Sequence, residues 1–397
     1  MLTRRTVVLS AAAATLLAAA RPASAAAGLR LTLPAPSGPH PVGTTSLRLI
    51  DRSRRDPWQP DRPYRELMVA VRYPARTTAG HPAAPQMLPG EAAGYAALNS
   101  LADIPADRID WSATRTHAHE DAPAAPGPHP VICYSPGAGD PRSLGTTLCD
   151  DLASRGYVVV MIDHTYDGPA VQFPDGRVEK SVLPQEYGEA YPDEARITAL
   201  LKKTVAVRVA DTRCVLDALP RRLRGTIDPD RIGMFGHSAG GFTALQTMHD
   251  DPRITAAANL DGVTAYVQDD STPGNLSTVA AEGLDRPFLL MGEDGNDLTT
   301  VPSWNSLWHR STGPRRGLTL TGARHATFTD AETLVPQIAR RLGLPRETVV
   351  KNIGTIAPWR AVMVQRECLA AFFDRWLRDR RTELPDVHPE TRLWPIG

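Results

Sequence analysis

The hydrophobic positions of the chain fall into two kinds of segment. Short runs that are apolar throughout are typical of strands buried on both faces, and longer segments carry apolar positions at helical spacing. We expect such strands at residues 131–134, 157–162, 231–235, 254–260, 287–291 and 317–320. We expect helices at residues 142–154, 193–219, 239–248, 303–309, 330–342 and 358–378. This alternation predicts an α/β fold with a mostly parallel central sheet and helices on both faces.

The N-terminal third follows a different pattern. Residues 45–51 alternate between polar and apolar and predict an edge strand, and residues 66–73 predict a second strand that stops at Pro74. Residues 75–128 are rich in Ala and Pro and only weakly periodic. A loop of this length is usually functional or mobile, so we expect a surface excursion or a wall of the substrate pocket.

The absence of internal repeats favours one large domain over several small ones. We expect a catalytic core over residues 129–380, with residues 26–128 as an irregular flank of the same domain and residues 381–397 as a C-terminal tail.

Residues 1–25 are predicted to be an export signal and not part of the fold. They have a charged start, an apolar run at 7–20 and a small-residue cleavage site at 23–25. The pair Arg4 and Arg5 favours the twin-arginine pathway over general secretion. No later apolar run approaches the roughly 18 residues of a membrane span. We therefore expect an exported, extracellular protein without a transmembrane segment.

Composition excludes several classes of function. The chain has 44 basic and 44 acidic residues, and this neutrality argues against nucleic-acid binding, which needs an excess of Lys and Arg. The four cysteines lack the C-x-x-C spacing of metal sites, and we interpret them as structural. The chain contains neither an H-E-x-x-H motif nor a Walker-type loop, so no metal and no cofactor are expected.

The strongest local motif is Gly-His-Ser-Ala-Gly at residues 236–240, which fits G-x-S-x-G. It lies between a predicted strand and a predicted helix, the context in which this motif presents a nucleophile. A serine on such a tight turn has a strained backbone, and side chains at the flanking glycines would collide with neighbouring strands. We therefore predict that Ser238 is a catalytic nucleophile.

A serine nucleophile needs a base, and in this architecture the acid and then the histidine follow the serine along the chain. His325 lies in the loop after the last predicted strand, from which it can reach back over the sheet, and we predict that it is the base. The other downstream histidines lie on helical segments or in the tail: His249, His309 and His388.

The acid is less well determined by the pattern. Asp261 follows one predicted strand, and Asp294 and Asp297 follow the next. Both loops lie at the carboxyl edge of the sheet, where such sites are built. The pattern alone does not choose between them.

Four segments taken together resemble the secreted platelet-activating factor acetylhydrolase family of α/β-hydrolases. They are residues 134–139, 236–241, 259–262 and 325–330. The resemblance implies the α/β-hydrolase fold. It also implies an acid in a Leu-Asp context a little over twenty residues beyond the serine, and this favours Asp261.

The oxyanion hole needs two backbone amides. One is that of Ala239, the residue after the nucleophile. The resemblance places the other at Ala138, in a loop that reads Ser-His-Gly-x-Gly in the family. Pro136 stands here where the family usually has histidine. Because a backbone amide at Ala138 is what the hole requires, we expect it to survive, with an altered pocket mouth.

Other polar and aromatic residues have weaker assignments. We favour a structural hydrogen bond for His164 over a place in the pocket. Four aromatic residues between His164 and the long helix could line an acyl pocket, form a lid or pack under a loop. They are Tyr166, Phe173, Tyr187 and Tyr191.

These residues predict an exported serine esterase that works through an acyl-enzyme, with Ser238 attacking, His325 moving the proton and Asp261 orienting His325. The resemblance implies a small ester or lipid substrate, with short-acyl or phospholipid esters such as platelet-activating factor, and leaves room for transient contact with a lipid surface. Three alternatives remain: a broad-specificity lipase or polyester hydrolase on the same scaffold, a serine peptidase, and a non-catalytic binding protein.

Overall fold

The computed structural model of the protein describes residues 29–384 and 388–395. The predicted export signal at residues 1–25 lies outside the described residues.

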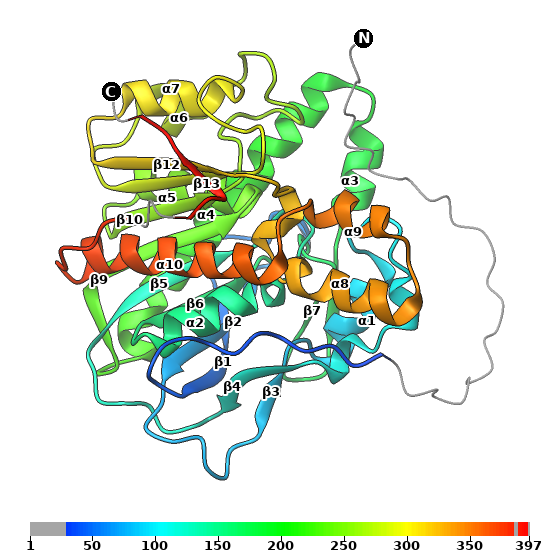
Figure 1. Ribbon diagram of the computed structural model, residues 1–397, viewed down its shortest axis with the longest axis vertical. Coiled ribbons are helices and arrows are strands. Elements are labelled where there is room, and N and C mark those ends of the chain that lie inside the picture. The colour runs from blue at the N-terminus through cyan, green and yellow to red at the C-terminus, as the bar shows by residue number, and fades with distance from the viewer. Residues whose placement is uncertain (1–28, 385–387, 396–397) are drawn as a thin grey trace.

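The centre of the molecule is an eleven-stranded sheet (Figure 1). Its strands, in spatial order, are β13 (Thr391–Leu393), β12 (Arg315–Leu320), β11 (Phe288–Gly292), β10 (Ile254–Leu260), β9 (Ile227–His237), β5 (His129–Ser135), β6 (Val158–Asp163), β2 (Arg65–Pro74), β1 (Val42–Asp51), β4 (Arg115–Glu120) and β3 (Ala83–Pro85). The run from β12 to β6 is parallel throughout. The predicted α/β-hydrolase fold with a mostly parallel sheet is therefore confirmed.

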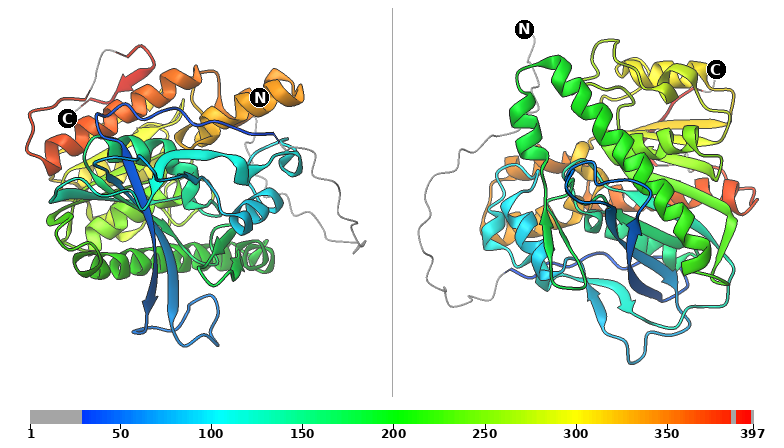
Figure 2. Two further views of the ribbon diagram at one scale, coloured as in Figure 1. Left: turned by 90° about the horizontal axis from the view of Figure 1, so that it is seen from below. Right: turned by 180° about the vertical axis from the view of Figure 1, so that it is seen from behind.

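Helices cover both faces of this sheet. In Figure 1 the viewer's side carries α2 (Thr146–Ser154) and α10 (Pro358–Leu377), and the view from behind in Figure 2 shows the long α4 (Glu194–Arg222) across the other face. The helix α5 (Ala239–Asp250) packs beside α4. The remaining helices are α1 (Pro89–Ala97), α3 (Leu183–Ala190), α6 (Thr278–Glu282), α7 (Pro302–Arg310), α8 (Ala331–Leu342) and α9 (Arg346–Ile353).

Alternation along the strands builds two cores. Successive side chains of a strand point to opposite faces. The residues of β5 and β6 that pack with α4 and α5 are Val131, Cys133, Val158 and Val160. Those that pack with α2 and α10 are Ile132, Tyr134, Val159 and Met161. Burial of both faces explains why these strands are apolar throughout.

The expected edge strand is not at the edge. β1 pairs with β2 on one side and with β4 on the other, and β3 lies beyond β4. The excursion at 75–128 supplies these two outer strands and α1, with Tyr95 and Trp111 packed edge to face at 4.8 Å between ring centroids. β3 has only 3 residues, and β4 has a single apolar residue, so neither shows the alternation that would have predicted it.

The four cysteines, all among the described residues, are free thiols, and three are buried. Burial raises the pKa of Cys133 and of Cys368 to about 12, so both thiols stay protonated and inert. This is the structural role that their positions predicted.

Candidate active site

The turn between β9 and α5 holds Ser238 in the backbone conformation that its motif requires. Ser238 has φ 54° and ψ −126°, in a region that few residues other than glycine adopt. Its amide donates to the carbonyl of Leu260 at 2.8 Å. A Cβ at Gly240 would lie 1.9 Å from the carbonyl oxygen of Ser135, and one at Gly236 would lie 2.3 Å from the carbonyl carbon of Gly240. The glycines thus allow the turn to sit tightly against the end of β5.

We expect Gly240→Ala to destabilise the protein by about 1–3 kcal/mol, because the new methyl must push the Ser135 backbone aside. Activity should fall with it, since the displaced segment adjoins Ser238. Thermal unfolding and ester turnover measure the two effects. Gly188→Ala is the matched control. A Cβ at Gly188 meets nothing, and this residue is exposed on α3, so the substitution should stabilise the protein by about 0.5–1 kcal/mol. Equal melting temperatures for the two variants would contradict the steric argument.

Asp261 and His325 form a hydrogen-bonded pair at the same edge of the sheet. Asp261 directly follows β10, and His325 opens a short 3-10 helix after β12. Nδ1 of His325 donates to Oδ2 of Asp261 at 2.6 Å. The other carboxylate oxygen accepts from the amide of Glu293 at 2.8 Å and from Nδ2 of Asn296 at 3.0 Å. A carboxylate only accepts, so Nδ1 carries the proton and Nε2 keeps its lone pair for catalysis.

The rival acids lie elsewhere. Asp294 is exposed, and Asp297 accepts hydrogen bonds from Thr299 within its own loop. The structure therefore brings Asp261, and not these two, to His325.

Electrostatics favour protonation of His325. Desolvation opposes the imidazolium, but the hydrogen bond and the charge of Asp261 outweigh it, with help from Glu293 and Asp140, so the pKa of His325 is raised. Burial and repulsion by Asp261 raise the pKa of Glu293. The His325 side chain is half-exposed, and it can reach a substrate as well as its carboxylate.

The two amides predicted to form the oxyanion hole lie at this edge too. β5 and β9 are parallel neighbours with Ser135 opposite Gly236, so the loops that follow them run side by side. Ala138 is exposed in the first loop, and Ala239 is the first residue of α5. The first amides of α5 have no acceptor within the helix, because no helical turn precedes them. They also lie at the positive end of the helix dipole, so they can stabilise a developing negative charge.

His164 has the structural role that we favoured. It is buried between Oγ of Ser135, 2.9 Å from Nε2, and Oδ2 of Asp211, 3.0 Å from Nδ1. Burial lowers its pKa, so it is neutral near pH 7. Tyr166 packs in a buried cluster with residues of α3 and α4, and Phe173 packs in a smaller one with Met68 and Val171, whereas Tyr191 is exposed.

Three residues that the sequence analysis did not single out support the site. His237 packs on His325 with ring centroids 4.4 Å apart, and its Nε2 donates to the His325 carbonyl at 3.0 Å. His237 is part of the Gly-His-Ser-Ala-Gly motif, and this position was the only feature of the sequence that could have identified it. Arg208 and Asp167 form a buried ion pair behind the loop of Ala138. No local sequence pattern distinguishes these two from other charged residues.

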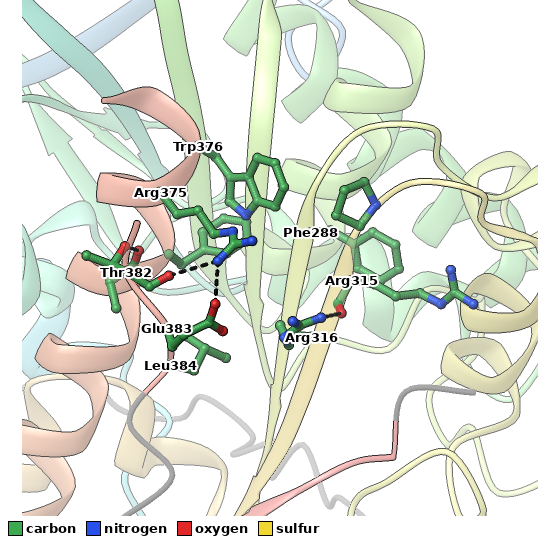
Figure 3. A pocket seen from close by; sticks show the side chains of 11 residues that line it. Phe288, Arg315, Arg316, Arg375, Trp376, Thr382, Glu383 and Leu384 are labelled. Atoms are coloured by element: carbon green, nitrogen blue, oxygen red, sulfur yellow. Dashed lines mark hydrogen bonds and ion pairs between the residues drawn. The ribbon is translucent and has the colours of Figure 1, made fainter. Parts of the chain in front are cut away.

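A cavity of about 180 Å³ is not part of this site (Figure 3). It opens among Phe288, Arg315 and Trp376, and Arg375 on its wall is paired with Glu383 at 2.7 Å. Phe288 and Arg315 begin β11 and β12, so the cavity lies at the amino edge of the sheet, opposite Ser238.

The fold and this edge of the sheet define an α/β-hydrolase. Residues 26–173 match the family model of platelet-activating factor acetylhydrolase, isoform II, and residues 185–283 match that of the prolyl oligopeptidase family. The chain is an α/β-hydrolase and a carboxylic ester hydrolase, and over residues 26–173 it is similar to the platelet-activating factor acetylhydrolase family.

Relatives in this group are named for different esters. The chain is 26% identical to a probable 1-alkyl-2-acetylglycerophosphocholine esterase of Arthroderma benhamiae, over 86% of this chain and 87% of that one. A ferulic acid esterase from Streptomyces cinnamoneus is 36% identical, with a TM-score of 0.73 over 92% of this chain and 99% of the other. A bis(hydroxyethyl) terephthalate hydrolase of Streptomyces coelicolor is 26% identical over 54% of this chain and 70% of its own length.

Proposed function

We propose that this esterase cleaves its substrate through an acyl-enzyme on Ser238. Oγ of Ser238 attacks the ester carbonyl while Nε2 of His325 takes its proton, and the amides of Ala138 and Ala239 stabilise the oxyanion. His325 then gives the proton to the leaving alcohol. Water repeats the sequence and frees the acid. The observation that carries this proposal is the 2.6 Å contact between His325 and Asp261, beside a serine at φ 54°.

We propose a short-acyl ester, with a phospholipid carrying a short acyl chain as the leading candidate. The match over residues 26–173 and the long alignment with the acetylglycerophosphocholine esterase support it. Because the relatives act on chemically different esters, the scaffold alone does not fix the substrate.

We also propose export, on the sequence of residues 1–25. Within the part of the chain that the structure describes, no helix is long and apolar enough to cross a membrane.

A substrate panel tests this function. It contains p-nitrophenyl acetate, butyrate and octanoate, an sn-2 acetyl phospholipid, methyl ferulate, bis(hydroxyethyl) terephthalate and a prolyl peptide amide. We expect the acetyl esters, the phospholipid included, to have the highest kcat/KM. A preference for the terephthalate or ferulate ester would contradict the proposed substrate class and leave the proposed acyl-enzyme mechanism unchanged. Cleavage of the peptide alone would favour a peptidase, and no turnover at all would leave a binding protein.

Activity should depend on a neutral His325. As pH falls through the pKa of His325, the base becomes protonated and kcat/KM should drop. Because Asp261 raises this pKa, the acid limb should lie above the ordinary histidine value of 6.5. The pH profile of kcat/KM measures it. In Asp261→Asn the limb should move to lower pH, and an unmoved limb would show that another group titrates.

A further inference from the structure

Arg208 lies behind the loop that carries Ala138 and is only 1% exposed. It comes from the middle of α4. Nη1 donates to the carbonyl of Pro136 at 2.6 Å, and Nη2 donates to the carbonyl of Gly137 at 2.9 Å. Two further donors bind Asp167 at 2.7 Å each, and Nη1 also reaches Oγ of Ser135 at 3.4 Å. All five N–H groups of the guanidinium are therefore used: two on the loop, two on Asp167 and one on Ser135 at the end of β5.

These contacts set the direction of one amide, together with the hydrogen bond from the Asp140 amide to the Gly137 carbonyl at 3.2 Å. In a trans peptide the C=O and the next N–H point in opposite directions. With the Gly137 carbonyl turned inward to Arg208, the N–H of Ala138 must point away from it. The next amide, that of Gly139, is tied back to Oδ1 of Asp167 at 3.0 Å. In the described part of the chain nothing accepts the N–H of Ala138. The N–H of Gly137 likewise has no acceptor in that part of the chain, so the loop presents two adjacent free donors, at Gly137 and Ala138.

A second buried chain of hydrogen bonds holds the start of the loop. His164 is neutral and its Nδ1 donates to Asp211, so its Nε2 accepts the hydroxyl proton of Ser135. Asp211 lies on α4 with Arg208, and it is held by Arg65. Both chains of contacts anchor the loop to α4.

We propose that Arg208, held by Asp167, is a positioning residue that forms the oxyanion hole by fixing the 137–138 peptide with the Ala138 N–H toward the reacting carbonyl. The proposal rests on the proposed function of Ser238 and Ala138. With the peptide rotated, the Gly137 carbonyl would face the oxyanion and repel it. The planar guanidinium donates to two successive carbonyls and a carboxylate at once, because its N–H groups have fixed directions. The single ammonium group of a lysine cannot make all of these hydrogen bonds.

Arg208→Lys tests the proposal, because it keeps a positive charge beside Asp167 but cannot donate to both loop carbonyls at once. We measure kcat and KM for p-nitrophenyl acetate, the affinity for an alkyl boronic acid that forms a tetrahedral adduct on the serine, and the melting temperature. Loss of one oxyanion donor costs about 10²–10³-fold in kcat. We expect kcat to fall by about 10–100-fold for a partly disordered loop, with the boronate affinity falling in parallel and KM changing little.

Arg72→Lys is the matched control. Arg72 is also buried and paired, to Asp150 at 3.0 Å, but it lies on β2 and makes no contact with the loop. It should lower the melting temperature and leave kcat and boronate affinity unchanged.

If Arg208→Lys does not fold, the double variant Arg208→Met with Asp167→Asn replaces it. It removes both buried charges and keeps an acceptor for the Gly139 amide. The same loss of kcat and boronate affinity is expected. Values near those of the wild type, in whichever variant folds, would overturn the proposal. Failure of the wild type to turn over any ester would instead overturn the proposed function.

Discussion

Ser238→Ala is expected to lower kcat for p-nitrophenyl acetate by about 10⁴-fold or more, because no acyl-enzyme can form without the hydroxyl. The melting temperature should stay close to that of the wild type. Alanine keeps the Cβ that the turn already accommodates at φ 54°, and the glycines that let it pack are untouched. Steady-state kinetics and calorimetry on the same preparation separate the two effects.

Ser53→Ala is a suitable control for that variant, because Ser53 lies in an exposed turn bonded to Asp51, after β1 and four strands along the sheet from β9. It should retain full activity. Turnover by Ser238→Ala near the wild-type rate would mean that another residue is the nucleophile.

Asp261→Asn is expected to lower kcat by about 10³–10⁴-fold. The amide keeps the shape of the side chain, so the contacts with Glu293 and Asn296 can persist. The asparagine lacks the negative charge that stabilises the imidazolium of His325. Its N–H group, if it faces Nδ1, would favour the tautomer that carries the proton on Nε2, which cannot act as the base. Kinetics on the purified, folded variant measure the loss.

The two rival acids supply the matched controls. Asp294→Asn and Asp297→Asn make the same chemical change in the neighbouring loop, and both should retain kcat within about twofold. A larger loss in either of them than in Asp261→Asn would contradict the assignment.

The parallel half of the fold could be predicted because burial on both faces leaves a direct trace in the sequence. The apolar runs at β5, β6 and β9 to β12 have few polar positions to obscure them. The order of serine and histidine along the chain then left four histidines, and the predicted element on which each lies favoured His325. The acid needed the family resemblance, since two loops end at the same edge, and only the hydrogen bond to His325 distinguishes Asp261 from Asp294 and Asp297 in space.

The outer strands and the support of the site could not be predicted. β3 has only 3 residues, and β4 has a single apolar residue, Ala118, so neither shows the periodicity that identifies a strand. Arg208 and Asp167 are charged residues of a kind that is normally exposed. Their burial depends on contacts between α4 and the loops after β5 and β6, and such pairings over long separations leave no local pattern.

Trapping of the acyl-enzyme tests the central claim most directly. The protein is mixed with p-nitrophenyl acetate, quenched in acid during turnover, digested and sequenced by mass spectrometry. We predict one acetyl group, located on Ser238, that disappears in Ser238→Ala. Rapid turnover with no acetyl group on Ser238, or with the acetyl group on another residue, would contradict the mechanism.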